Sequence, residues 1–221
     1  YFPMPLSSLN AISPVDGRYH RHTHILGPLL SEFGLIKHRV EVEVKYFIDL
    51  VSLPLPQLDG FPKEKFEDMR ELYLHFSEAD AQRIKDLEAT TNHDVKAVEY
   101  WIKEEMVKLG VSQWSEFVHF GLTSQDVNNT AIPLSLKRAT EEVYLPLVDE
   151  VIAKLSGLAN DWKSVPMLAR THGQSASPVT LGKEVSVFEN RLRIQRDAIA
   201  NAVYAAKFGG ATGGFNAHKV A

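Results

Sequence analysis

Residues Tyr144–Trp162, YLPLVDEVIAKLSGLANDW, carry the pattern that decides the fold. Apolar side chains recur three and four positions apart, at Tyr144, Val148, Val151, Leu155, Leu158 and Trp162. Such a heptad seam is typical of a long helix that packs lengthwise against parallel or antiparallel neighbours. We expect this helix to begin at Thr123 or Ser124 and to be kinked at Pro133 and Pro146.

A second long helix is predicted to start at Pro178, because proline suits the first turn of a helix. This helix is expected to fade near Phe208, before a glycine-rich loop. Its apolar positions are Leu181, Val185, Phe188, Leu192 and Ile199. Two helices cannot bury both seams in a single hairpin, so further helices must come from later sequence or from other chains.

The chain before Thr123 reads as a small helical domain. Residues 1–23 are rich in proline and glycine and are expected to be irregular. The apolar periodicity predicts a short helix capped by Ser77 and Asp80, and other helices over about 26–53, 63–76, 91–109 and 112–120. Because strand-like alternation is nearly absent, we predict an all-α protein. Its N-terminal helical domain spans 1–122, and 123–221 forms the first part of a long helical bundle.

Composition and charge exclude several classes of function. The 221 residues carry a formal net charge of −4 at pH 7, which argues against non-specific binding to nucleic acid or to an anionic membrane. Cysteine is absent, so the chain has no disulfide, thiolate metal site or cysteine nucleophile. The absence of cysteine leaves the compartment unconstrained, and a reducing cytoplasm is the default expectation. We find no apolar run long enough to span a bilayer and no signal-peptide pattern.

Four polar clusters lie at helix ends or in loops, where functional groups tend to collect. In SPVDGRY, Arg18 and Tyr19 could hold a carboxylate or a phosphate, although a turn with a surface arginine is the simpler interpretation. The second cluster stands at a helix start, which favours an anion, and consists of Thr90, Thr91, Asn92, His93 and Asp94. The alternative there is helix capping by Thr91 or Asp94 with a solvated His93.

The other two clusters flank the first long helix. Thr123 and Ser124 precede it and could bind an anion, although a simple Thr or Ser cap explains them as well. His172, in the loop after the helix, titrates in the range needed for proton transfer, but a lone loop histidine is more often solvated. A metal site at the alternating histidines 20, 22 and 24 is disfavoured, because no acidic partner stands nearby at a known spacing.

Taken together and in this order, the clusters resemble the fumarase/aspartase superfamily and, within it, the adenylosuccinate lyase family. The resemblance covers nearly the whole chain. The matching stretches are 13–19 (SPVDGRY), 90–100 (TTNHDVKAVEY), 116–129 (EFVHFGLTSQDVNN), 170–176 (RTHGQSA) and 213–218 (GGFNAH). The second stretch discriminates, because argininosuccinate lyases and fumarases carry other residues there. The family's usual proline after Thr-His-Gly-Gln is Ser175 here.

The resemblance implies a β-elimination that releases fumarate from adenylosuccinate, and also from the succinylated imidazole carboxamide ribotide of purine biosynthesis. A base removes the proton next to a carboxylate, and an acid protonates the nitrogen that leaves. The carboxylate itself holds the charge of the intermediate, so neither a cofactor nor a metal is implied. Such a carbanion needs aimed donors and cations in a closed site.

Residue roles follow from the same resemblance. His172 is the general acid, and the second catalytic histidine, His93, orients the substrate. Thr123 and Ser124 donate to the succinyl carboxylates. The remaining substrate contacts are Arg18, Tyr19, Asn92, Asp94 and Thr171, with Arg18 and Tyr19 near the phosphate. His119 is expected to support these contact residues without touching the substrate itself. The family's homotetramer, whose sites draw on several subunits, is the expected assembly.

The family's Gly-Ser-Ser loop, which carries the catalytic base, does not occur in this sequence. We therefore expect this chain to resemble the N-terminal half of such an enzyme and to lack measurable activity alone. Two alternatives remain open: a sister enzyme such as argininosuccinate lyase, or a non-enzymatic helical scaffold.

Helix length also bears on the assembly. About forty residues at about 1.5 Å each would span roughly 55–60 Å between Ser124 and Trp162. Groups at opposite ends of such a helix cannot touch one small substrate. The site is therefore expected to combine Ser124 of one chain with His172 of another.

Overall fold

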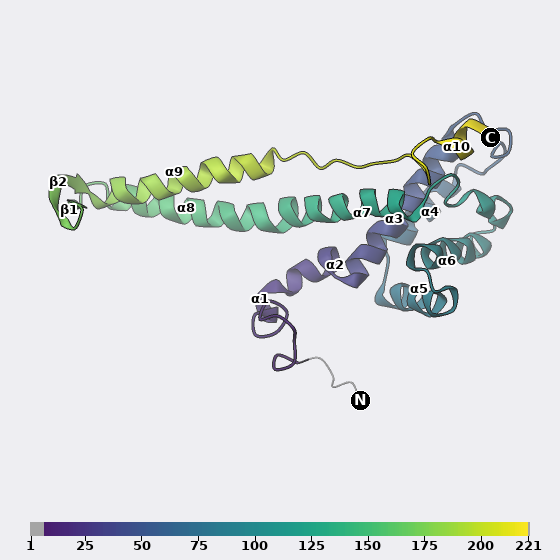
Figure 1. The fold of residues 1–221 in the computed structure, drawn as a ribbon, viewed down its shortest axis with the longest axis horizontal. Helices are drawn as coiled ribbons and strands as arrows, with labels where there is room; N and C mark the ends of the chain where they lie inside the picture. Colours follow the sequence, from purple (N-terminus) through teal and green to yellow (C-terminus); the bar gives the residue numbers. More distant parts are fainter. Residues whose placement is uncertain (1–6, 221) are drawn as a thin grey trace. The chain divides into compact units, whose positions relative to one another are not determined.

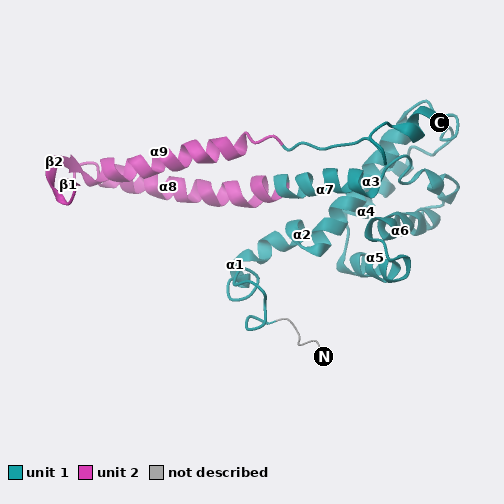
Figure 2. Ribbon diagram, in the orientation of Figure 1, with its two compact units in different colours: residues 1–137, 204–221 teal, residues 138–203 magenta. Residues whose placement is uncertain are grey.

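The computed structural model describes residues 7–220, which form two compact units. Of the described residues, 7–137 and 204–220 form the first unit, and Arg138–Val203 form the second (Figure 2). Both are mostly helical, which confirms the predicted fold class apart from one two-stranded sheet. No helix in the described part of the chain combines the length and apolar character needed to cross a membrane.

The first unit is built on the long helix α3 (Glu32–Ser52) (Figure 1). The Ser31 side chain caps α3 by accepting the N–H of Gly34, and Pro54 follows the last turn. The other elements of this unit are α1 (His20–Thr23), η1 (His24–Leu26), α2 (Gly27–Leu30), α4 (Lys65–Leu74), α5 (Glu78–Thr91), α6 (Asp94–Lys108), η2 (Ser112–Phe117), α7 (Ser124–Arg138) and α10 (Asn216–Val220).

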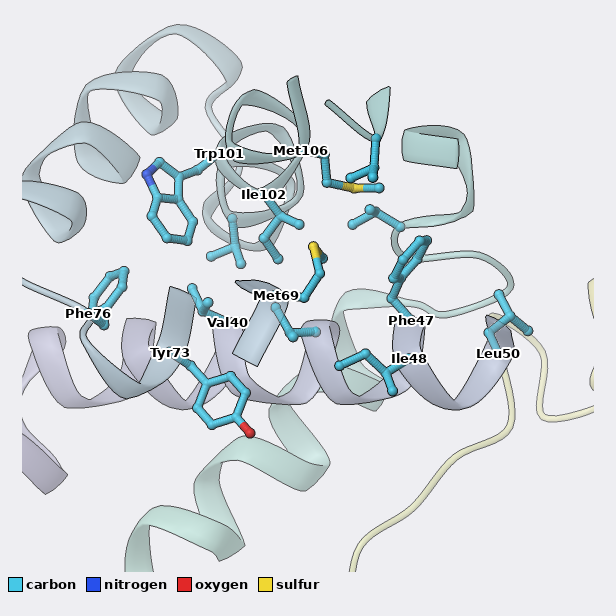
Figure 3. Packing of buried hydrophobic residues seen from close by; sticks show 14 of the residues in the cluster. Val40, Phe47, Ile48, Leu50, Met69, Tyr73, Phe76, Trp101, Ile102 and Met106 are labelled. Atoms are coloured by element: carbon cyan, nitrogen blue, oxygen red, sulfur yellow. The ribbon is translucent and has the colours of Figure 1, made fainter. Parts of the chain in front are cut away.

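One apolar stripe of α3 forms the centre of the core. Val40, Val44 and Phe47 are fully buried and pack among side chains of α4, α5 and α6, including Met69 and Ile102 (Figure 3). Full burial of side chains of this size contributes about 1.5–3 kcal/mol each. This core fixes the orientation of α6, whose first residues belong to the candidate site.

A side-chain cap marks the start of α5 and another marks the start of α6. The predicted cap at Ser77 and Asp80 is confirmed as a reciprocal capping box, but α5 is longer than the short helix expected there. Its length follows from Ala81 and Ile84, which are buried in the core. The cap of α6 is His93, and not Thr91 or Asp94 as in the capping alternative, because the imidazole Nδ1 accepts the N–H of Lys96.

The irregular start predicted for residues 1–23 is wrong at its end, where α1 is helical. The backbone N–H groups of His22 and Thr23 both donate to Tyr19 O. The Thr23 hydroxyl also donates to Val15 O at 2.7 Å, which holds the preceding loop against this turn. Residues 1–6 lie outside the described residues.

The second unit contains η3 (Ala139–Tyr144), a π-helical segment, followed by α8 (Leu145–Asp161) and α9 (Leu181–Ala200). Helical conformation is unbroken from Ser124 to Asp161, as the seam predicts. The wide turn η3 ends two residues before Pro146, whose ring would crowd a regular helical turn.

The predicted seam of α8 is only partly correct. Val148 and Leu155 are half-buried as expected, but Leu145 and Ile152 are the buried positions. Tyr144 and Val151 remain 50% and 51% exposed. A single partner helix, α9, covers only one side of α8, so the buried stripe is narrower than the apolar surface that the sequence offers.

A β-hairpin replaces the predicted start of the second long helix. Its antiparallel strands are β1 (Pro166–Thr171) and β2 (Gln174–Thr180), and Pro178 lies in β2 opposite Leu168. Each strand of a two-stranded sheet has a free edge, so a proline that lacks an N–H is tolerated there. α9 begins only after Thr180, whose hydroxyl accepts the N–H of Lys183.

α9 also ends earlier than the predicted end near Phe208. Its last residue is Ala200, and the Asn201 side chain donates to Asp197 O at 2.7 Å. A side chain that bonds to the last-turn carbonyls in this way competes with continuation of the helix.

Candidate active site

The N-termini of α6 and α7 lie next to each other in the first unit. Asp94 and Ser124 are the first residues of these helices. The Oγ of Ser124 lies 3.2 Å from the Nε2 of His93, the cap of α6. Helix starts present unpaired backbone N–H groups and the positive end of the helix dipole, so their meeting favours an anion.

The cap also determines how the His93 ring can act. Its Nδ1 accepts the Lys96 N–H at 3.1 Å, so in the neutral ring the proton must be on Nε2. Nε2 then donates to Ser124 Oγ, which leaves the serine hydroxyl proton available to another acceptor. The His93 side chain is half exposed, so a ligand can reach this pair.

A buried carboxylate orients the start of α7. Asp126 Oδ2 accepts the backbone N–H groups of Thr123 at 3.1 Å and Gly210 at 3.0 Å, and its Oδ1 accepts that of Gly209 at 3.1 Å. The glycine-rich segment that sequence analysis treats as a loop is thereby fixed beside Thr123. The Thr123 hydroxyl accepts the Gln125 N–H at 3.3 Å and can still donate.

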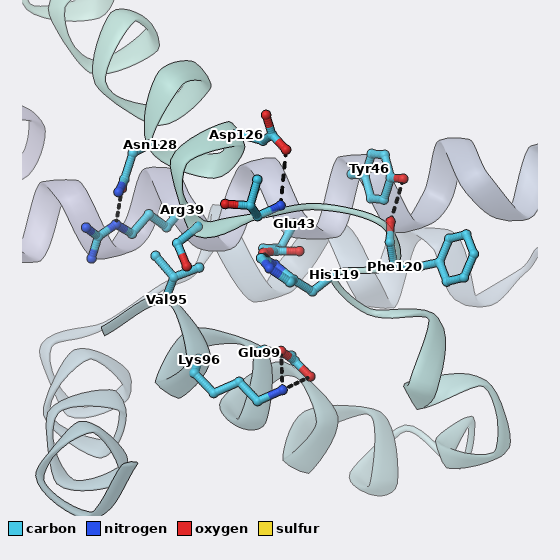
Figure 4. A network of polar contacts seen from close by, with 12 residues as sticks. Arg39, Glu43, Tyr46, Val95, Lys96, Glu99, His119, Phe120, Asp126 and Asn128 are labelled. Carbon is cyan, nitrogen blue, oxygen red and sulfur yellow. Dashed lines mark hydrogen bonds and ion pairs between the residues drawn. The ribbon is translucent and has the colours of Figure 1, made fainter. Parts of the chain in front are cut away.

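Asp94 has two partners within the protein. Arg39 Nη2 lies 2.7 Å from its Oδ2, and the Val95 N–H donates to its Oδ1. Burial alone would raise the pKa of Asp94, but the Val95 N–H and the Arg39 charge lower it. Arg39 also donates from Nε to the Asn128 side chain, so one buried guanidinium ties α3 to the starts of α6 and α7 (Figure 4).

Two further pairs of charged side chains lie in the same unit. The Nδ1 of His119 contacts a carboxylate oxygen of Glu43, and Lys96 bridges both oxygens of Glu99 at 2.9 Å (Figure 4). Burial raises the pKa of Glu43. Burial lowers the pKa of His119, but the hydrogen bond and charge of Glu43 outweigh this and raise it.

The remaining predicted residues of the first unit are exposed. The Arg18 guanidinium lies over the Tyr19 ring, 5.6 Å from its centre. Asn92 ends α5 in a left-handed conformation with φ 51°. No contact among the described residues joins these three side chains to His93 or Ser124.

Thr171 and His172 lie in the second unit, at the tip of the hairpin. His172 and Gly173 form its two-residue turn with φ values of 51° and 77°. Positive φ at both positions is the geometry of a type I′ turn. A non-glycine residue held in this conformation is often found at functional sites. The His172 side chain is exposed.

Metal ligation finds no support in the residues that the structure covers. They contain no group of three or more His, Cys, Asp or Glu side chains that could hold an ion. The histidines at 20, 22 and 24 fall in α1 and η1 instead of an extended segment.

Sequence analysis missed Arg39 and Glu43 as parts of this site. A signal was present for both, since Arg39 and Glu43 are charged and four residues apart beside the apolar stripe of one helix. Buried charges of this kind need partners. The pairing of Asp126 with Gly209 and Gly210 had no local signal, because it joins segments more than eighty residues apart.

Comparison with known proteins places the chain among lyases. Residues 39–221 match the family model described as Lyase. The adenylosuccinate lyase of Dictyostelium discoideum is 52% identical over 221 residues, and that of Vibrio cholerae serotype O1 is 44% identical over 217 residues. These alignments cover 97% of this chain and 47% and 48% of the relatives. The chain thus spans about half the length of the curated relatives it matches.

Solved structures share the fold. A fumarate lyase from Mesorhizobium sp. BNC1 matches with a TM-score of 0.66 at 21% identity, over 88% of this chain and 44% of that one. The 3-carboxy-cis,cis-muconate lactonizing enzyme of Pseudomonas putida matches with a TM-score of 0.64 at 20% identity, over 89% and 44%. At these identities the likeness concerns the fold alone.

Proposed function

Since this chain belongs to the lyase family whose model matches its residues 39–221, we propose that the protein eliminates fumarate from adenylosuccinate to give AMP. The curated relatives aligned with nearly all of the chain carry the name of that enzyme. The same chemistry would release fumarate from the succinylated imidazole carboxamide ribotide, an earlier step of purine nucleotide biosynthesis.

The observation that carries the proposal is the contact between His93 and Ser124 across two helix starts. Adenylosuccinate is polyanionic, with two carboxylates and a phosphate. Two helix N-termini that meet, with hydroxyl and imidazole donors between them, are suited to bind one of these groups. We assign the succinyl carboxylates to Thr123 and Ser124.

Elimination breaks a C–N bond after a proton is removed from the carbon next to a carboxylate. The electron pair of the C–H bond becomes the new C=C bond of fumarate, and the nitrogen leaves with the C–N pair and needs a proton. We assign that proton to His172, whose imidazole is exposed at the hairpin tip. His93, with its proton on Nε2, donates a hydrogen bond and orients the substrate.

The remaining roles concern substrate binding. Arg18 and Tyr19 would hold the nucleotide near its phosphate, and Asn92 and Thr171 would complete the polar contacts. Asp94 forms an ion pair with Arg39. Asp94 would therefore hold the start of α6 in place as well as contact the substrate.

We further propose a cytoplasmic homotetramer in which each site combines the first unit of one chain with the hairpin of another. The exposed apolar side chains of the second unit support this assembly: Tyr144, Leu147, Val151, Val165, Met167, Leu168, Phe188 and Ile194. Apolar surface of this extent in one unit is typical of an interaction site.

A chimera tests the proposed reaction. This chain replaces the matching part of the Dictyostelium discoideum adenylosuccinate lyase, which supplies the remainder of the protein. Fumarate release is then measured with adenylosuccinate and, in parallel, with argininosuccinate. Release from adenylosuccinate alone is expected. The chimera carrying His172→Ala is the matched control for turnover by a contaminating lyase.

Each other outcome selects an alternative. Turnover of argininosuccinate in place of adenylosuccinate would assign the chain to the sister enzyme. A folded chimera that turns over neither substrate would favour the non-enzymatic scaffold. The 221-residue chain alone is expected to show no turnover, because it contains no Gly-Ser-Ser loop.

A further inference from the structure

A buried acid and a histidine form a pair that the proposed reaction does not use. Glu43 lies on α3, and its side chain is 0% exposed. His119 lies in the turn between η2 and α7, and its side chain is 19% exposed. Glu43 Oε1 contacts His119 Nδ1, whereas Glu43 Oε2 is buried with no hydrogen-bond partner.

This arrangement lowers the stability of the fold, so we look for its role in the positioning of the histidine. A buried carboxylate oxygen without a partner is destabilising. The backbone of His119 also has φ 63°, a value that residues other than glycine rarely adopt. The same backbone turn leads directly into the candidate site, because the Leu122 N–H donates to His119 O immediately before Thr123. The turn therefore links His119 to the start of α7.

The charges that face His119, besides Glu43 itself, come from α6. Glu99 favours a proton on the pair, and Lys96 opposes a proton on His119 and is itself held by Glu99. On α3, Tyr46 also faces Glu43, and its pKa is raised to about 12 by burial and by the charges of Glu43 and Asp126, so this phenol is neutral. Glu43 and Glu99 thus outnumber the one cation that opposes a proton on His119.

We infer that Glu43 is a positioning residue that fixes the ring orientation of His119, keeps a proton on its Nδ1 and maintains the ring as a cation beside the start of α7. With Nδ1 donating to Glu43, the second proton of the charged ring is on Nε2. His119 then adds positive charge to the region where two helix starts favour an anion. This role rests on the proposed function only for the identity of the anion.

Nuclear magnetic resonance of the 221-residue chain, with ¹⁵N-labelled histidine, tests the inference without substrate. In the wild-type chain the His119 ring is expected to carry its proton on Nδ1 and to titrate above its ordinary midpoint near 6.5. A neutral ring protonated only on Nε2 would overturn the inference, and this measurement needs no variant.

Variants then separate charge from hydrogen bonding. Glu43→Gln keeps an oxygen acceptor and removes the charge, so the Nδ1 proton should remain while His119 binds its proton at least about tenfold more weakly, a shift of one pH unit. Glu43→Asp should restore part of the loss. Glu41→Gln is the matched control, because Glu41 is buried on the same helix but pairs with Lys45.

An unchanged His119 titration in a folded Glu43→Gln chain would refute the positioning role. A separate titration, from acid to alkaline pH, measures adenylosuccinate binding to the chimera and to its Glu43→Gln form, both carrying His172→Ala so that the substrate is not consumed. Binding should weaken as His119 loses its proton, and Glu43→Gln should move that transition to lower pH. If adenylosuccinate does not bind at all while the ring data hold, the proposed substrate is wrong and the Glu43 inference stands.

Discussion

The two histidines assigned to the reaction are held in opposite ways. His93 caps α6, donates to Ser124 and stands on a packed core in the first unit. His172 lies at the tip of a two-stranded hairpin in the second unit, exposed and in a left-handed conformation. The difference teaches that packing within one chain fixes His93 at the candidate site, whereas the hairpin leaves the proposed acid His172 exposed.

Replacement of His172 should have the largest effect. In the chimera, His172→Ala is expected to lower kcat by about a hundred- to ten-thousand-fold, with little change in KM, because general acid catalysis contributes that much. Stability should hardly change, since the exposed ring contributes little packing. Steady-state kinetics and thermal unfolding check both parts. A rise in KM alone would make His172 a binding residue.

Replacement of Arg39 should show the opposite behaviour, with a primary effect on stability. Arg39→Met removes an ion pair with Asp94 and a hydrogen bond to Asn128 from a side chain that is 6% exposed. Because Asp94 is 45% exposed and can be rehydrated, the loss is expected to be about 1–3 kcal/mol.

Urea unfolding of the chain measures this loss. Arg83→Met is the matched control, because Arg83 pairs with Glu104 on the exposed surface and should matter little. Equal effects of the two substitutions would show that the junction of α3, α6 and α7 is not stabilised by Arg39.

The pH dependence of stability is the smallest expected effect. The folded chain raises the pKa of His119 above its ordinary value of 6.5, so it binds more protons there than the unfolded chain. The stability from this site is fully present below about pH 6.5 and is lost as the pH rises through the elevated pKa. The raised pKa of Glu43 acts in the same direction but from lower pH, because its contribution is fully present only below about pH 4.5.

We expect stability to fall on the alkaline side, measured by urea unfolding as a function of pH. His119→Gln should flatten the curve. Stability that rises with pH through this window in the wild-type chain, and not in His119→Gln, would contradict the direction given for this pair.

The helices were predictable because their signals are local. The capping box at Ser77 and Asp80 depends on residues within one turn, and Gly110, with φ 76°, follows the end of α6. The hairpin was missed because two weak signals disagreed. His172-Gly173 suits a two-residue turn, but Pro178 was interpreted as a helix start. Tertiary structure decided in favour of the strand, where a missing N–H is tolerated.

In the candidate site, too, residues with a local sequence signal were predictable and contacts between distant segments were not. Thr123, Ser124 and His93 could be singled out because they stand at helix starts. Their contact could not be predicted, since it joins residues far apart in the chain through the packing of α6 and α7. The distant partners of Glu43 and Asp126 were hidden for the same reason, because they come from segments far away in the chain.

The measurement that tests the account most directly is complementation between two inactive chimeras. One carries Ser124→Ala, in the first unit, and the other carries His172→Ala, in the second. Each alone should be nearly inactive. Unfolded and refolded together, they should regain part of the fumarate release from adenylosuccinate, because some sites receive both native residues from different chains. If mixed oligomers form and no activity returns, Ser124 and His172 serve the same chain, and the proposed shared site is wrong.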